Sequence, residues 1–504
     1  MPSVAEFLVE RLENLGVGHV FGVVREKSNP FVDGVNCSSK INFVSSVDEN
    51  GAGFCADTYA RVRGVGCVSA NYNAGALKLC NAIAGAYSER SPVMVVSIST
   101  PAKNRNDDFL LHHVVRSFDN QQKIFKNITC NSTILSDATK AGFAIDKAIE
   151  DMVANKQPVY LEIPSDVACS PIRYDVYREG TPSSKGSDRE SLADAVSETS
   201  EWITASSKPV ILVGVQVVRY GLSDKLVRFA EKYNIPMITT LLGKSSIDEN
   251  HPLFAGVYCG SKSSDPCVLS AMDDSDCLLV FGECLADMTM GLESPRFAKR
   301  QAVFCSTDGL YVKKHLYNDV SFLDFCNSLF SLSFEPKSSQ VFCPQGEFEA
   351  DMAFLYRKIA SMVSSDRNLA VVSDSGDYLA MSSRIRVRQN RFFSPAFQYS
   401  SGFAIPGSIG VQLACPDVRP IVILGQNSFK VSMLEIPTMV SLKLNPIIVV
   451  LGDTGFDLGI FRDFYGSGHG WKVSCEEDLE KAMVASMKSK EISLISLNLK
   501  RENS

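Results

Sequence analysis

The chain has 504 residues, a length that corresponds to about three domains. Hydrophobic residues make up 45% of the sequence and charged residues 21%, which is the composition of an ordinary globular protein. The net charge of −7, without a long run of Lys or Arg, argues against nucleic acid or an anionic membrane as the main partner. No apolar stretch reaches transmembrane length, and MPSVAEFLVERLENLG predicts an amphipathic helix without the apolar core of a signal peptide, so we expect a cytoplasmic protein that does not bind membranes.

The fifteen cysteines are scattered singly along the sequence. They form no CxxC pair and no metal-ligand spacing with histidine. We therefore interpret them as reduced thiols that serve mostly as small buried apolar residues.

Residues 1–172 alternate segments of helical and strand periodicity. Leu8, Leu12 and Leu15 line one face of the first predicted helix. Strands are predicted at HVFGVV, FVSSV, CVSANYN, VMVVSIS and PVYLEIP, with helices over 50–62 and 77–87 between them. This repetition predicts a domain built on a doubly wound parallel sheet.

Two further α/β domains are predicted after it. Residues 173–195 are polar and contain Pro, Gly and Ser, which predicts a linker. The strands PVILVGV, PMITTL, CLLVFG and AVFCS predict a central domain over 196–334, and 335–347 predict a second linker. The strands AVVSDSG, IVILGQN, IIVVLGD and ISLISLNL predict the third domain over 348–504. The expected fold class is α/β, with three doubly wound parallel sheets.

Two turns in the third domain are the first candidate for a site. Gly425, Gln426 and Asn427 follow one predicted strand, and Gly452 and Asp453 follow the next. Open α/β sheets bind ligands at the carboxyl ends of their strands. Short turns at that edge commonly hold a phosphate with backbone N–H groups, often through a divalent cation.

Several segments carry a family likeness. They are VAEFLVERLENLGVGHVFGV, DENGAGFCADTYARVRG, LLHHVV and GKSSIDENHPLFAGVYCG, in that order. Through them the chain resembles the thiamine diphosphate-dependent 2-oxo-acid decarboxylases, pyruvate and indolepyruvate decarboxylase in particular, over essentially its whole length. The resemblance implies dimers or tetramers whose sites lie between the first domain of one subunit and the third domain of another.

The resemblance also assigns roles to residues of the first domain. Glu49 matches the glutamate that activates the cofactor, His112 and His113 match an adjacent histidine pair, and Glu26 falls where the family has an aspartate. From the residues alone, other interpretations stay open. An acidic residue at the start of a helix is stabilised by the helix dipole, and a histidine pair in a polar loop is often solvated surface.

The matching residues of the third domain depart from the family pattern. The resemblance places the diphosphate against five residues, namely Gly376, Asp377, Gly425, Ser428 and Gly455. Asp377 would bring an extra negative charge to it, which at about 5 Å and an effective dielectric near 20 costs about 3 kcal/mol. Gln426 stands where the family has a metal-binding aspartate, and Asp453 stands where it has an asparagine. A magnesium ion held by this exchanged pair would tolerate little misplacement.

Further departures gather around the same predicted pocket. Ser401 falls where a bulky apolar side chain supports the cofactor, Arg25 where a glycine admits it, and Gly459 where a glutamate acts on the substrate. The family's last helical segment and tail, which exclude water from the site, have no counterpart after GHGWKV.

These observations leave three hypotheses. The first is a decarboxylase-fold protein that has lost thiamine diphosphate catalysis, binds no cofactor and acts as a structural or assembly component, as a dimer, a tetramer or a higher-order assembly. The alternative is an active decarboxylase of pyruvate or a related 2-oxo acid, dependent on thiamine diphosphate and on magnesium held by Gln426 and Asp453. The third is a cleft that binds another, less anionic ligand beside Arg25.

Overall fold

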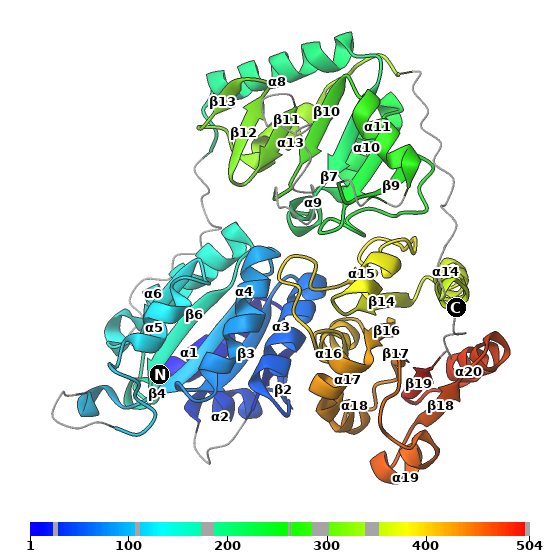
Figure 1. Cartoon of the computed structure of the whole chain (residues 1–504). Helices are drawn as coiled ribbons and strands as arrows, with labels where there is room; N and C mark the ends of the chain where they lie inside the picture. Colours follow the sequence, from blue (N-terminus) through cyan, green and yellow to red (C-terminus); the bar gives the residue numbers. More distant parts are fainter. Residues whose placement is uncertain are drawn as a thin grey trace. The chain divides into compact units, whose positions relative to one another are not determined.

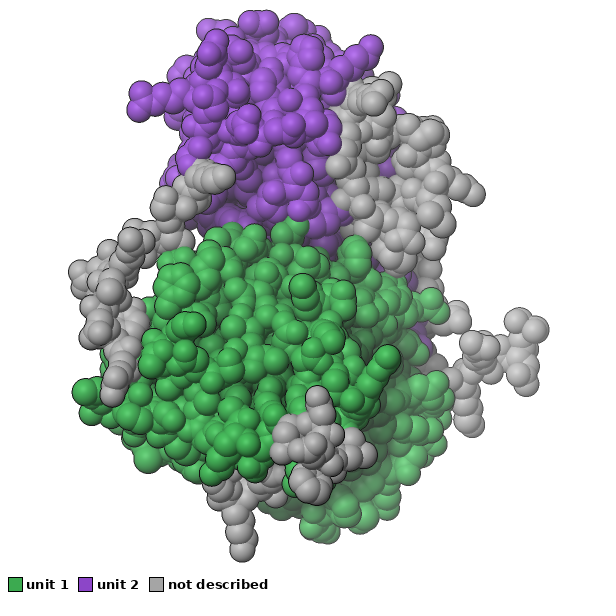
Figure 2. Space-filling view, turned by 90° about the vertical axis from the view of Figure 1, so that its left-hand side faces the viewer, with its two compact units in different colours: residues 1–182, 371–378, 393–504 green, residues 183–370, 379–392 purple. Residues whose placement is uncertain are grey.

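The chain forms two compact units, drawn in green and purple in Figure 2. Unit 1 comprises Met1–Pro182, Val371–Tyr378 and Phe393–Ser504, and unit 2 comprises Ser183–Ala370 and Leu379–Phe392. Most of both predicted linkers lies outside the described residues. The computed structural model describes residues 1–23, 29–105, 111–172, 186–260, 263, 265–284, 302–337 and 352–498. Within these ranges, every helix is too short or too polar to cross a lipid bilayer.

The first sheet lies in unit 1 and has the strand order β2-β1-β3-β4-β6-β5, with all neighbouring strands parallel. Its strands are β1 (His19–Gly22), β2 (Asn42–Ser45), β3 (Gly66–Asn71), β4 (Val93–Ser99), β5 (Asn131–Ile134) and β6 (Val159–Pro164). Its helices are α1 (Val4–Asn14), α2 (Pro30–Cys37), α3 (Glu49–Arg63), α4 (Cys80–Ser88), α5 (Asn120–Phe125), α6 (Ala138–Asn155) and α7 (Ser165–Ala168), with short 3-10 turns η1 (Ala76–Leu79) and η2 (Ala102–Asn104).

Local sequence signals determine where helix α1 begins and which face it buries. Ser3 caps the helix, because its hydroxyl accepts the Glu6 N–H at 3.2 Å while the Glu6 carboxylate accepts the Ser3 N–H at 2.7 Å. Leu8 and Leu12 on the apolar face are fully buried. The predicted helix and the parallel sheet of this region are confirmed.

The second sheet lies in unit 2, with the order β13-β12-β11-β10-β7-β8-β9. Its strands are β7 (Pro209–Val213), β8 (Met237–Thr240), β9 (Phe254–Tyr258), β10 (Cys277–Phe281), β11 (Val303–Ser306), β12 (Gly309–Val312) and β13 (His315–Tyr317). Its helices are α8 (Arg189–Ala205), α9 (Val215–Arg219), α10 (Ser223–Tyr233), α11 (Pro266–Asp274) and α13 (Phe322–Ser331). Strands β7 to β11 are parallel as predicted, but β12 and β13 add an antiparallel edge. Only Thr307 and Asp308 separate β11 from β12, which is too short a connection for a parallel crossover.

The third sheet has the order β15-β14-β16-β17-β19-β18. Its strands are β14 (Leu369–Ser373), β15 (Phe392–Phe393), β16 (Arg419–Gly425), β17 (Ile447–Leu451), β18 (His469–Val473) and β19 (Ser493–Leu497). The helices of this part of the chain are α14 (Ala353–Ser365), α15 (Asp377–Ser382), α16 (Ala404–Ala414), α17 (Gln426–Ser432), α18 (Ile436–Ser441), α19 (Phe461–Tyr465) and α20 (Glu476–Lys488), with 3-10 turns η4 (Met433–Glu435) and η5 (Leu458–Ile460) (Figure 1).

Within unit 1, helix α3 of the first sheet crosses helix α16 of the third. The crossing is close because a Cβ on Gly410 would lie 2.1 Å from the Cys55 carbonyl oxygen and 2.2 Å from the Thr58 hydroxyl. The Thr58 hydroxyl donates a hydrogen bond to the Gly407 carbonyl at 2.8 Å. Phe54 and Phe403 add an edge-to-face contact with ring centroids 5.3 Å apart. The crossing fixes the helix that begins with Glu49 against the domain that carries the two turns.

Candidate functional site

Two turns at the carboxyl ends of β16 and β17 form the first part of the site. The strands are parallel with Gly425 opposite Leu451, so the turns that follow them are neighbours. The side-chain carbonyl of Gln426 (Oε1) accepts a hydrogen bond from the Asp453 N–H at 3.2 Å. Gly452 has a φ of +116°, and a Cβ there would lie 2.9 Å from Gln426 Oε1, so the position requires glycine. The amide of Gln426 therefore bridges the two turns directly.

The fold thus brings together the two predicted metal ligands, Gln426 and Asp453, but both side chains already serve the turns. Asp453 is exposed, and its carboxylate accepts the Gly455 N–H at 3.0 Å. In the part of the chain that the structure describes, no group of three or more His, Cys, Asp or Glu side chains is placed to hold a metal ion. Because magnesium demands near-ideal oxygen geometry, the donor set as it stands does not fit this ion.

The ring of Tyr378 lies against the start of the first turn. A Cβ built on Gly425 would lie 2.5 Å from Tyr378 Cε2 and 2.6 Å from its hydroxyl oxygen. The ring therefore covers the backbone that a diphosphate would have to approach. Gly376, with a φ of +96°, and the exposed Asp377 precede it in the predicted phosphate-binding turn. Solvent screening at an exposed carboxylate reduces the repulsion that Asp377 would exert on a phosphate.

Ser428, another predicted cofactor residue, is part of a buried hydrogen-bond cluster. Its hydroxyl donates to the Asp374 carboxylate at 3.1 Å and lies 2.7 Å from the Ser401 hydroxyl. Asp374 is fully buried and also accepts the N–H groups of Gly402 at 3.1 Å and Ala404 at 3.0 Å. Burial raises the pKa of Asp374, while these hydrogen bonds oppose the shift. The cluster connects the end of β14 to the start of α16, and the Ser428 hydroxyl already forms hydrogen bonds within it.

Glu49 occupies the second part of the site, at the start of α3. Its side chain is 2% exposed, and Asp48 caps the helix by accepting the Asn50 N–H at 2.9 Å. The ammonium of Lys78, on η1, lies 2.9 Å from Asp48 Oδ2 and 3.1 Å from Glu49 Oε2. A Cβ on Gly75 would lie 2.9 Å from Glu49 Oε1, so the loop that leads to η1 also packs against this carboxylate. Sequence reasoning missed Lys78, because no motif marks a lysine 29 positions after Glu49.

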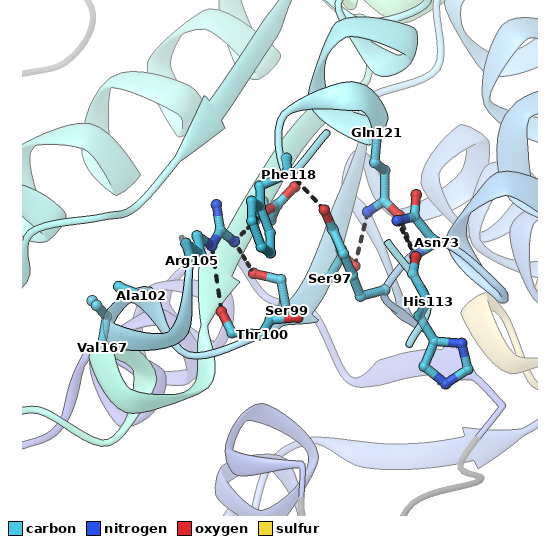
Figure 3. Close-up of polar contacts among 12 residues, drawn as sticks. Asn73, Ser97, Ser99, Thr100, Ala102, Arg105, His113, Phe118, Gln121 and Val167 are labelled. Carbon is cyan, nitrogen blue, oxygen red and sulfur yellow. Dashed lines mark hydrogen bonds and ion pairs between the residues drawn. The ribbon is translucent and has the colours of Figure 1, made fainter. Parts of the chain in front are cut away.

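The histidine pair lies on an exposed loop with an unusual backbone. His112 and His113 are exposed, their ring centroids are 4.7 Å apart, and His113 has a φ of +68°. The side-chain amide of Asn73 donates to the His113 carbonyl oxygen, and the Asn73 N–H donates to the side chain of Gln121. Figure 3 shows the imidazole of His113 turned away from these hydrogen bonds. Because Asn73 lies two residues before Gly75, one loop contacts both the histidine segment and Glu49.

A row of hydrogen-bonded polar side chains lies next to this loop (Figure 3). Gln121 donates to the Ser97 hydroxyl at 3.0 Å. Farther along, the guanidinium of Arg105 donates to the Ser99 hydroxyl at 2.6 Å and to the Glu162 carboxylate at 2.5 Å. Burial raises the pKa of Glu162, and the charge of Arg105 opposes the shift. These contacts fix the carboxyl ends of β4 and β6 beneath the histidine segment.

Three predicted residues around the site remain. Glu26 and Arg25 lie outside the described residues. Gly459 is exposed, and its N–H donates to Asp457 at 2.9 Å. The position at which the resemblance expects a substrate-contacting glutamate therefore carries no side chain.

Three family models match the chain. They are the N-terminal TPP binding domain of thiamine pyrophosphate enzymes over residues 2–124, their central domain over 196–327 and their C-terminal TPP binding domain over 374–459. The chain is 26% identical to an indole-3-pyruvate decarboxylase from Azospirillum brasilense, over 90% of this chain and 84% of that protein. It is 25% identical to pyruvate decarboxylase 1 from Pisum sativum, over 98% and 89% of the two chains. A Candida albicans pyruvate decarboxylase is 27% identical, over 90% and 84%.

Proposed function

The chain belongs to the thiamine pyrophosphate enzyme family of 2-oxo-acid decarboxylases, and we propose that it is a member that has lost thiamine diphosphate catalysis. It would serve instead as a homo-oligomeric structural or assembly component. Such a protein needs its fold, its α3–α16 crossing and its buried cores in order to assemble. It does not need the groups that bind a charged cofactor.

The observation that carries this proposal is the closure of the two turns by the chain's own side chains. A diphosphate would have to displace the Tyr378 ring from Gly425, and a cation would have to break the bridge from Gln426 to Asp453. Each neutral hydrogen bond given up without replacement subtracts about 1 kcal/mol from binding. The neutral amide of Gln426 also binds a divalent cation more weakly than a carboxylate does.

An exposed apolar surface on unit 1 supports self-association. Val431 and Leu434 are 67% and 61% exposed and stand three positions apart on α17 and η4. Val47 is 45% exposed, and its N–H donates to Glu435, the residue after Leu434, at 3.0 Å. Exposed apolar residues that lie near one another mark an interface more often than scattered ones do. We call these three residues the Val431–Leu434 surface.

Titration calorimetry of the full chain with thiamine diphosphate and magnesium tests the loss of the cofactor. We expect no binding in the micromolar range and no carbon dioxide from pyruvate. Micromolar binding accompanied by carbon dioxide release would overturn the proposal. A double variant, Tyr378→Ala with Gln426→Asp, should bind the cofactor more tightly than the wild type if closure of the turns is the cause.

An active 2-oxo-acid decarboxylase is the second candidate. The buried carboxylate of Glu49 at the start of α3 favours it, as do the names of the relatives. In that case Gln426 and Asp453 would have to leave their turn hydrogen bonds and share the cation. The variant Asp453→Asn would then abolish magnesium-dependent binding, whereas the first proposal expects it to change nothing that calorimetry detects.

A further inference from the structure

A buried ion pair lies in the loop that follows β8 of unit 2. The Lys244 ammonium is 2.6 Å from Glu249 Oε2, and the two side chains are 1% and 0% exposed. The N–H of Ser245, which has a φ of +61°, donates to Glu249 Oε1 at 2.9 Å. Burial lowers the pKa of Lys244, and the charge of Glu249 opposes the shift. Taking two charges out of water is costly, so such a pair needs further hydrogen bonds to hold it.

These hydrogen bonds come from a segment much later in the chain, which also belongs to unit 2. The Lys244 ammonium donates to the Ile385 carbonyl oxygen at 2.8 Å, and Glu249 Oε2 accepts the Val387 N–H at 3.1 Å. The Glu249 N–H donates to the Val387 carbonyl oxygen at 3.0 Å, and Ile385 and Val387 are fully buried. We call residues 383–391 the strap. They lie between α15 and β15 and form neither helix nor strand.

The rest of the strap is basic and more exposed. Arg388, whose side chain is 44% exposed, forms an ion pair with Asp248 at 3.3 Å. The Asn390 N–H donates to the Ser245 carbonyl oxygen at 2.9 Å. Asp248 and Ser245 belong to the same loop as the buried pair, so the strap is bound to this loop along most of its length. The strap contains four arginines, each partly or well exposed, namely Arg384, Arg386, Arg388 and Arg391.

We propose that the Lys244–Glu249 pair is a latch, and that the strap is a conformational element that opens when the pair breaks while the sheets stay folded. Segments whose hydrogen bonds lie outside helices and sheets open locally at lower free energy than the sheets do. At the centre of the strap these bonds are made by two buried charged side chains. Loss of one charge leaves the other buried and unpaired, which favours the open strap. Opening exposes Ile385, Val387 and the backbone beside the arginines, and it requires no cofactor.

Limited trypsin digestion of the full chain, followed by mass spectrometry, tests the latch. Trypsin cleaves after arginine only where the backbone is locally open, so fragments that begin or end within residues 384–391 report opening of the strap. In Lys244→Met we expect these fragments to appear at least about tenfold faster than in the wild type, because the Glu249 carboxylate is left without its cation. Circular dichroism of the same sample should show that the sheets remain folded.

Asp248→Asn is the matched control. It removes the carboxylate that pairs with Arg388 at an exposed position of the same loop, and it keeps every arginine of the strap. An exposed ion pair contributes little, so we expect the cleavage rate to change less than about twofold.

A double variant, Lys244→Met with Glu249→Met, removes both charges and keeps similar side-chain volumes, so it should fold even if the single variant does not. It also lacks the two central hydrogen bonds to the strap, and cleavage should again be at least about tenfold faster than in the wild type. A wild-type cleavage rate in either folded variant, or equal acceleration in Asp248→Asn, would overturn the latch. Loss of the folded circular dichroism signal in both variants would overturn it too, because the strap would then open only with the whole of unit 2.

Discussion

At the scale of single residues, Gln426 illustrates that a side chain expected to bind a ligand can instead form a hydrogen bond within the protein. The order of strands and turns in the sequence predicts that Gln426 and Asp453 are neighbours, because adjacent parallel strands bring their carboxyl ends together. It does not predict how the side chains are used. Whether an amide faces a cation or donates and accepts within a turn depends on torsion angles, and these follow from packing around Gly452 and Tyr378.

Removing the Gln426 bridge should cost stability without any ligand. Gln426→Ala deletes the acceptor of the Asp453 N–H, and we expect the free energy of unfolding to fall by about 1 kcal/mol. Asn427→Ala removes the neighbouring exposed amide and should change it by less than about 0.5 kcal/mol. Urea denaturation of both variants measures the difference. Equal stability of the two variants would show that the bridge contributes nothing.

Glu283 gives a pH dependence at the same scale. It is fully buried just after β10, where the Thr240 hydroxyl donates to its Oε2 at 2.5 Å, and burial raises its pKa from 4.5 to about 8. The folded chain therefore binds a proton that the unfolded chain releases above pH 4.5. This stabilisation is complete below the unfolded pKa and is lost as pH rises through about 8, with a slope of at most about 1.4 kcal/mol per pH unit.

Glu283→Gln, which is permanently neutral, should remove this slope. Denaturation in urea at pH 5 to 8.5 should show the wild type losing stability relative to the variant as pH rises. Glu335→Gln, at an exposed carboxylate, is the control and should follow the wild type. Parallel profiles for the wild type and Glu283→Gln would mean that Glu283 ionises without cost.

At the scale of elements, the sequence predicts most of the parallel strands correctly because each is a short apolar run that ends in a turn. It misses α2, since Pro30–Cys37 is short and lies between two strands that follow each other closely in the sequence. It also misses the antiparallel edge β12–β13. The apolar spacing of a strand is the same in either direction, and only the two-residue connection after β11 reveals the reversal.

The crossing of α3 and α16 depends on the absence of a side chain at one position. Gly410→Ala would bring a methyl group within 2.1 Å of the Cys55 carbonyl oxygen, so the helices must separate. We expect a loss of about 2–3 kcal/mol in unfolding free energy. Gly34→Ala inside α2 meets only Val9 at 3.4 Å and should be neutral or stabilising by up to about 1 kcal/mol. Thermal melts of the two variants compare them, and similar melting temperatures would contradict the role of the crossing.

At the scale of the whole molecule, we expect substitutions in the Val431–Leu434 surface to reduce the mass of the assembly. Val431→Lys with Leu434→Lys places two charges on a surface that self-association would bury, so light scattering after size exclusion should report a smaller assembly than the wild type forms. Phe143→Lys is the control, since Phe143 is 77% exposed on α6 and belongs to no such surface. A wild type that is already monomeric, or a double variant of unchanged mass, would contradict self-association through this surface.

The α3–α16 crossing also has a consequence for synthesis on the ribosome. Helix α3 ends at Arg63, whereas α16 begins at Ala404, and residues assigned to unit 2 are translated between them. At 5–20 residues per second, roughly 20–70 s pass before the partner helix emerges. During that time the apolar face of α3, with Phe54 and Cys55, has no native cover from α16. Nascent chains of this protein should therefore depend on chaperones that shield the N-terminal sheet until the last fifth of the chain is being synthesised.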